Sequence, residues 1–162
     1  MSTNFQKVKE FNAAFGLQNG ESPDADVFTE NPKLVKFRMS LITEEVQELQ
    51  DAIKAKDMKE TIDALADIEY VVQGMAAGLG IDLDRAFEIV HKSNMSKLCR
   101  TETDAIETVR RYKVKYDTDD SPYDSPDYRK SNDGLYWVVF NSSTGKILKS
   151  YKYTPANFDD ML

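Results

Sequence analysis

Apolar residues recur every three or four positions through most of the first 100 residues, which predicts a series of amphipathic helices. Pro32 suits the first turn of a long helix, and Gly80 suits a helix end. Gly20 and Pro23 indicate a loop between the first two helices. We expect a mainly α fold whose four core helices span approximately residues 4–15, 32–56, 58–79 and 82–91.

The composition changes after Cys99. Residues 101–112 predict one more short helix, and residues 117–133 are rich in Asp, Ser, Pro and Tyr, as is typical of a loop. Segments 135–140 and 146–151 flank Ser-Ser-Thr-Gly and predict a β-hairpin. We therefore expect a helical domain over residues 1–100 and an extension over 101–162. Because an isolated hairpin is only marginally stable, the extension should pack on the domain or on a partner subunit.

The charge and the cysteine content narrow the classes of function. A net charge of −7 over 162 residues disfavours nucleic acid as a partner, since that requires a basic surface. No apolar run is long enough to span a bilayer, and the first residues lack the pattern of a secretory signal, so we expect no membrane partner. Cys99 is the only cysteine, which rules out an internal disulfide. A cytoplasmic location is the expected one.

The second predicted helix carries carboxylates within its apolar face. Glu44, Glu45 and Glu48 lie in the run Thr-Glu-Glu-Val-Gln-Glu-Leu, and side chains three or four positions apart share one helix face. Glu45 falls inside the apolar stripe and Glu48 on its edge. Arg38 lies on the same stripe, two turns before Glu45. Taken alone, a Glu-Glu-x-x-Glu run is more often a solvated face than a site.

The third predicted helix repeats this arrangement. Asp63 and Asp67 stand four positions apart beside the apolar face, with Glu60 one turn earlier. Gly74 and Gly78 follow, and because glycine weakens a helix interior, the pair suggests close packing against another group. Carboxylates between packed helices are costly unless they are paired or bind a cation. Oxygen ligands suit Mg²⁺ or Mn²⁺, which screen phosphate groups.

These motifs together resemble the all-α superfamily of MazG-like and phosphoribosyl-ATP-pyrophosphohydrolase-like enzymes. The resemblance rests on residues 38–49 and 63–72, and is strengthened by Gly-Ile-Asp-Leu-Asp at 80–84 and His-Lys-Ser-Asn-Met-Ser-Lys at 91–97. Residues 145–155 are similar to the ending of one bacterial and viral branch. The resemblance implies an all-α NTP pyrophosphatase-like bundle that forms a homodimer or homotetramer. It also implies hydrolysis of a nucleoside triphosphate to the monophosphate and pyrophosphate with Mg²⁺ or Mn²⁺.

The resemblance assigns metal ligands position by position. Glu45 and Glu48 match the first metal motif, and Asp67 matches the aspartate that closes the second, Glu-x-x-Asp. The chain departs from this pattern at Ala64, where the family usually has the glutamate. Asp63 is the expected substitute, and Glu60 with Asp63, shifted by one turn, is the alternative.

Other residues have roles that the resemblance suggests less directly. Asn94 and Lys97 match positions that reach the substrate phosphates, and a lysine suits a phosphate as a point charge. Glu44 is the candidate to orient or deprotonate the attacking water. The alternative is that Glu44 does not touch the water and only positions the metal ligands. Arg38 either contacts substrate or pairs with Glu45. For His91, a structural hydrogen bond is favoured over a role at the site.

Two other functions remain open at this point. A non-catalytic helical module that binds nucleotides would keep the fold, with Ala64 as a sign of lost chemistry. A phosphoribosyl-ATP pyrophosphohydrolase is less favoured, because the sequence shows none of the fuller histidine-pathway pattern. The base and sugar of the substrate are not indicated by the sequence, and the predicted hairpin could pack on the protein or bind a partner.

Overall fold

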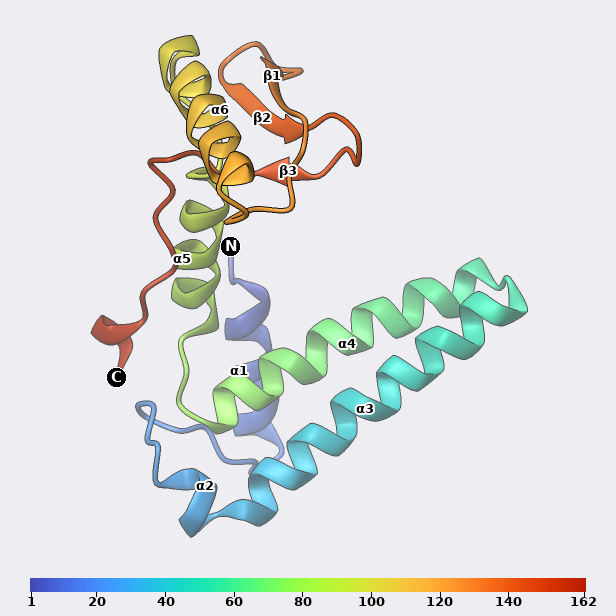
Figure 1. Cartoon of the computed structure of the whole chain (residues 1–162). Coiled ribbons are helices and arrows are strands. Elements are labelled where there is room, and N and C mark those ends of the chain that lie inside the picture. The colour runs from blue at the N-terminus through green and yellow to red at the C-terminus, as the bar shows by residue number, and fades with distance from the viewer. The chain divides into compact units, whose positions relative to one another are not determined.

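The computed structural model describes residues 1–162 and is mainly helical, with one small antiparallel sheet (Figure 1). This confirms the expected fold class.

The chain forms two compact units, of which the first comprises Met1–Phe87 with Phe158–Leu162 and the second Glu88–Asn157. The units therefore divide within a helix, earlier in the chain than residue 100. None of the helices is long and apolar enough to cross a bilayer. The elements are α1 (Asn4–Ala14), α2 (Val27–Glu30), α3 (Pro32–Ala55), α4 (Met58–Gly78), α5 (Leu83–Met95), α6 (Glu102–Asp117), β1 (Pro126–Lys130), β2 (Trp137–Asn141), β3 (Ile147–Leu148) and a final 3₁₀ turn, Asp159–Met161.

A long helical pair dominates the first unit. Helices α3 and α4 pack side by side along their length (Figure 1). The reversal between them is short because Lys56 adopts the left-handed conformation at the end of α3. Asp57 then caps α4 by accepting hydrogen bonds from the backbone N–H groups of Lys59 and Glu60, at 3.0 and 3.2 Å. This tight connection fixes which residues of the two helices face each other.

Helix α1 packs against the C-terminal part of α4 and completes a small apolar core. Phe5 of α1 is buried there with Ala76 and Ala77. A capping box at Thr3 starts α1, and the Thr3 hydroxyl also donates to Asp84 at 2.6 Å. Gly80 has a positive φ of 72°, and a side chain there would collide with the Ser22 backbone. The loop before α2 and the end of α4 therefore meet backbone to backbone.

The second unit places α6 against the sheet. The strand order is β1-β2-β3, with both pairs antiparallel. The backbone of Cys99 forms an isolated antiparallel β-bridge with Trp137 of β2. Its core consists of Cys99 before α6, Ala105 and Val109 of α6, and Val139 and Leu148 of two strands. The predicted hairpin thus pairs β2 with β3, and it is covered within its own unit.

Three local expectations were wrong. Residues 27–30 form the short helix α2 within a segment expected to be loop throughout. Helix α6 continues to Asp117 rather than ending near residue 112. Residues 126–130 form strand β1, although they were expected to be loop. The sequence does not indicate this strand because its proline and charged side chains are uncommon in strands. The strand is defined by its pairing with β2, for example Asp127 opposite Phe140.

A buried asparagine fixes the turn between β2 and β3. Asn141 is fully buried, and its amide nitrogen donates to Asp124, Ser143 and Thr144 at 3.0, 2.9 and 3.1 Å. Asp124 also accepts hydrogen bonds from the hydroxyls of Ser143 and Ser125, at 2.6 and 2.9 Å. These hydrogen bonds lower the pKa of Asp124 to about 2.

Candidate active site

One line of α3, with residues seven positions apart, faces α4. Arg38 and Ala52 on this line are buried, and Glu45 between them is half-buried. Two charged side chains thus occupy positions that an ordinary helix pair fills with apolar residues. Burying charge in this way is costly unless a partner compensates it, which marks the surroundings of Glu45 and Arg38 as the candidate site.

Glu45 lies among other carboxylates. Burial raises the pKa of its carboxyl, and the negative charges of four neighbours raise it further: Glu48, Asp67, Glu44 and Asp63. Its Oε2 atom is buried and has no hydrogen-bond partner. The structure therefore places acidic residues of both α3 and α4 near Glu45, and no positive group offsets their effect on its charge.

The second metal motif is altered at Ala64, which is only 3 % exposed. Asp63, one position earlier, is exposed and close enough to act on the charge of Glu45, as is Asp67 one turn later. Glu60 is not among the groups that act on Glu45. Both members of the expected pair, Asp63 and Asp67, thus lie near Glu45, and the choice between this pair and Glu60 with Asp63 stays a prediction.

The donor chemistry of these residues fits a hard divalent cation. Carboxylate oxygens suit Mg²⁺ and Mn²⁺, and a cation would offset both the repulsion around Glu45 and its unpartnered oxygen. However, no three acidic, histidine or cysteine side chains lie close enough together to form a ligand cluster. The backbone thus gathers the donors on one face, and their side chains do not adopt a ligating arrangement in this structure.

Arg38 occupies a cradle formed by two glycines of α4. A Cβ atom added at Gly74 would lie 3.0 Å from Nη1 of Arg38, and one at Gly78 would lie 3.4 Å from its Nε. The expected packing reason for this glycine pair is therefore the arginine side chain. Nε is buried without a hydrogen-bond partner, and burial lowers the pKa of the guanidinium. Arg38 forms no ion pair with Glu45, so that alternative is not realised.

One further polar group in this region was missed from the sequence. The side-chain oxygen of Gln73 is buried and has no hydrogen-bond partner. Gln73 directly precedes Gly74, and glutamine carries no signal that separates it from an ordinary helix residue. Three unsatisfied buried polar atoms, on Arg38, Glu45 and Gln73, thus belong to the same helical pair.

The predicted phosphate-contacting residues belong to the second unit. Nζ of Lys97 donates to Oδ1 of Asn94 at 2.7 Å, and the ammonium has no carboxylate partner. Lys97 is half-buried, and its carbonyl accepts a hydrogen bond from the Ser150 backbone at 3.0 Å. His91 is exposed and does not form the structural hydrogen bond that we expected.

A helical unit that places carboxylates of two packed helices around a half-buried glutamate is the arrangement expected of a class, the MazG-like all-α NTP pyrophosphatases, whose members generally use a divalent metal. The family model described as phosphoribosyl-ATP pyrophosphohydrolase matches residues 8–94, and the chain belongs to this family within that superfamily. It is accordingly a pyrophosphohydrolase. An uncharacterized protein of Acanthamoeba polyphaga mimivirus is 30 % identical, over 99 % of this chain and 96 % of its own length.

Proposed function

We propose that the protein is a metal-dependent nucleoside triphosphate pyrophosphohydrolase. It would convert a (d)NTP and water to the (d)NMP and pyrophosphate, by attack of water at the α-phosphorus. The observation that carries the proposal is Glu45, whose buried, unpartnered carboxylate oxygen lies among four other carboxylates. A divalent cation would offset the repulsion on Glu45 and partner its buried oxygen, and a nucleoside triphosphate is the substrate that binds together with divalent ions.

Each residue of the site has a proposed role. Glu45, Glu48, Asp63 and Asp67 hold the metal, which supplies positive charge to screen the phosphate oxygens when it is bound. Glu44 is exposed at the edge of the cluster and accepts the proton of the attacking water. Arg38 binds the phosphates and stabilises the charge that develops on the leaving pyrophosphate. For Asn94 and Lys97, phosphate binding stays a prediction from the family resemblance.

The family match gives a second candidate substrate, phosphoribosyl-ATP. That compound is cleaved at the same kind of α–β phosphoanhydride bond, so the metal ligands alone do not separate the two candidates. We favour a common (d)NTP because the sequence lacks the fuller histidine-pathway pattern beyond the shared helices.

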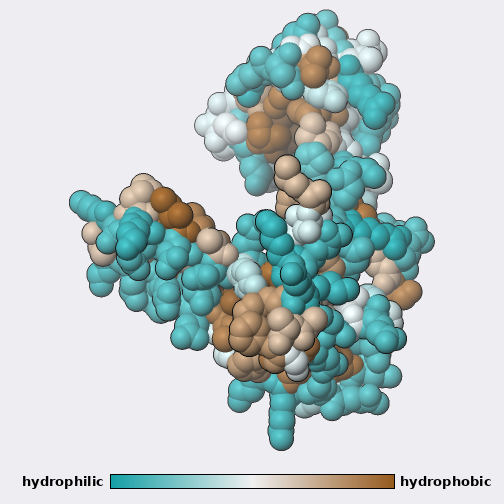
Figure 2. Space-filling view, turned by 180° about the vertical axis from the view of Figure 1, so that it is seen from behind, coloured by the Kyte–Doolittle hydropathy of each residue, from teal (hydrophilic) through white to brown (hydrophobic).

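We also propose that the active form is a homodimer or homotetramer. The connecting end of the α3–α4 pair exposes large apolar side chains: Ile53, Met58, Ile62 and Leu65, which are 59, 70, 63 and 53 % exposed. Figure 2 shows hydrophobic residues gathered on this part of the pair. A second copy would remove this surface from water, and light scattering coupled to size-exclusion chromatography measures the oligomeric state.

The test is pyrophosphate release from a panel of all common NTPs and dNTPs together with phosphoribosyl-ATP. We expect turnover with Mg²⁺ or Mn²⁺ and none after chelation with EDTA. Glu48→Gln should abolish turnover while leaving the circular dichroism spectrum unchanged. The matched control is Asp51→Asn on the same helix, which removes an exposed carboxylate that does not act on Glu45.

Two outcomes would contradict the proposal. Full activity of Glu48→Gln would overturn the assignment of the metal ligands. Binding of nucleotides with Mn²⁺ but without any turnover across the panel would favour the non-catalytic module instead.

A further inference from the structure

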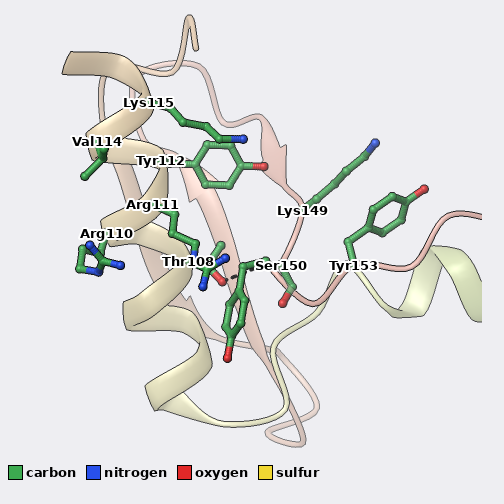
Figure 3. A pocket seen from close by; sticks show the side chains of 10 residues that line it. Thr108, Arg110, Arg111, Tyr112, Val114, Lys115, Lys149, Ser150 and Tyr153 are labelled. Carbon is green, nitrogen blue, oxygen red and sulfur yellow. Dashed lines mark hydrogen bonds between the residues drawn. The ribbon is translucent and has the colours of Figure 1, made fainter. Parts of the chain in front are cut away.

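A cavity of about 620 Å³ lies entirely within the second unit, between α6 and the segment that follows β3. Its size falls within the range of sites for small molecules. Figure 3 shows Tyr112 and Lys115 of α6 facing Lys149 and Tyr153 of the C-terminal segment. None of its lining residues belongs to the first unit, so this cavity is separate from the carboxylates of α3 and α4.

The lining is basic, although the protein as a whole is acidic. The cavity is lined by four cationic residues and by no aspartate or glutamate, in a chain with a net charge of −7. Glu107 outside the lining pairs with Arg110 and Arg111, with N–O distances of 2.8 Å. Lys115 and Lys149 have no carboxylate partner. Two uncompensated positive charges thus remain at the cavity, where they favour an anion.

Aromatic rings supply the second part of the lining. The guanidinium carbon of Arg111 lies 4.4 Å from the centre of the Tyr151 ring, and Nζ of Lys149 lies 4.4 Å from the centre of the Tyr153 ring. Flat rings beside cations form the kind of surface on which a nucleobase stacks next to bound phosphate. Tyr112 contributes a third ring to the lining, and burial raises the pKa of its phenol.

The cavity is also held in place by neighbouring contacts. The Tyr151 hydroxyl donates to Asp104 at 3.1 Å, and its backbone N–H donates to the buried Thr108 hydroxyl at 3.2 Å. The Ser93 hydroxyl donates to the Tyr153 hydroxyl at 3.3 Å. These bonds attach the C-terminal segment to α5 and α6, so the rings are oriented before any ligand binds.

We propose that this cavity binds a nucleoside phosphate without a divalent metal, its base against the tyrosine rings and its phosphate against Lys115 and Lys149. The site is additional to the proposed catalytic site. It needs no metal, because Lys115 and Lys149 supply the positive charge that divalent ions supply among carboxylates.

The test is isothermal titration calorimetry of the full-length protein in EDTA, with AMP, ADP and inorganic phosphate as separate probes. Chelation prevents metal-dependent binding at the carboxylates, so failure of the proposed catalytic function does not affect this measurement. We expect AMP and ADP to bind, ADP more tightly than AMP, and both more tightly than inorganic phosphate. Raising the salt concentration should weaken binding of all three.

The double variant K115E/K149E locates the site. It should weaken AMP and ADP binding by about tenfold or more, since each substitution replaces attraction of the phosphate with repulsion. The matched control is K113E/K146E, which has the same total charge but changes two exposed lysines outside the cavity. This control should bind within about twofold of the wild type, and both variants should keep the wild-type circular dichroism spectrum.

Three results would overturn the proposal. The first is no detectable binding of AMP or ADP to the wild type in EDTA. The second is equal affinity for inorganic phosphate and AMP, which would mean that the rings contribute nothing. The third is an equal loss of binding in K115E/K149E and K113E/K146E, which would show that the protein's overall charge controls binding.

Discussion

The guanidinium of Arg38 lies against the bare α-carbon of Gly74, at a distance that leaves no room for a methyl group without a shift. The arginine is 6 % exposed and has no carboxylate partner. A glycine on one helix thus makes space for a buried cation on the other. This relationship explains a position that helix propensity alone would fill with alanine.

Gly74→Ala should impair activity more than stability. Alanine stabilises a helix interior by about 1 kcal/mol relative to glycine, which offsets part of the crowding. The added methyl group must displace the guanidinium, so we expect kcat/KM to fall about tenfold, equivalent to about 1.4 kcal/mol. Gly78→Ala is the control. Its added Cβ would lie 3.4 Å from the nearest Arg38 atom, against 3.0 Å for Gly74→Ala, so kcat/KM should fall less. Unchanged kcat/KM in Gly74→Ala would show that the position of Arg38 is not critical.

Arg38→Met should separate a functional role from a structural one. Methionine fills much of the same space without an unpaired charge, so the melting temperature should stay the same or rise. If Arg38 binds phosphate, the KM for the nucleotide should rise at the same time. A lower melting temperature with unchanged KM would instead assign Arg38 a purely structural role.

Asp67→Asn and Glu60→Gln should distinguish the two forms of the second metal motif, because Asp63 belongs to both. Asp67 acts on the charge of Glu45, so Asp67→Asn should remove most of the activity and Glu60→Gln little of it. The measurement is pyrophosphate release over a range of Mn²⁺ concentrations, because a lost ligand should raise the metal requirement. The reverse order of effects would favour the motif shifted by one turn.

Asp124→Asn should destabilise the second unit in a manner that depends on pH. The folded-state pKa of about 2 lies below the ordinary value of about 3.9, so ionised Asp124 stabilises the fold above pH of about 4. This contribution is lost as the pH falls through about 2, where the folded-state carboxyl is protonated. Urea unfolding followed by the fluorescence of Trp137, the only tryptophan, should show a difference between wild type and variant at pH 7 that disappears near pH 2.

The control for this pH series is Asp120→Asn, which removes an exposed carboxylate outside the hydrogen-bond network of Asn141. It should match the wild type throughout. A difference between wild type and Asp124→Asn that is independent of pH would contradict the role of the charge.

The sequence by itself determined the helices of the first unit and the face on which the carboxylates lie. The helical period of 3.6 residues places Glu45 in the apolar stripe of α3 independently of the other segments. Pro32 and Gly80 are local signals for the start of one helix and the end of another. Only the tertiary structure decided that Arg38 rests on Gly74 and Gly78 and that Asp63 and Asp67 of α4 lie near Glu45 of α3. Strand β1 and the basic cavity of the second unit likewise depend on contacts between segments distant in sequence, such as the pairing of Asp127 with Phe140. Local patterns specify helices because their hydrogen bonds are local, whereas strand pairing, burial of charge and cavities arise only when distant residues meet.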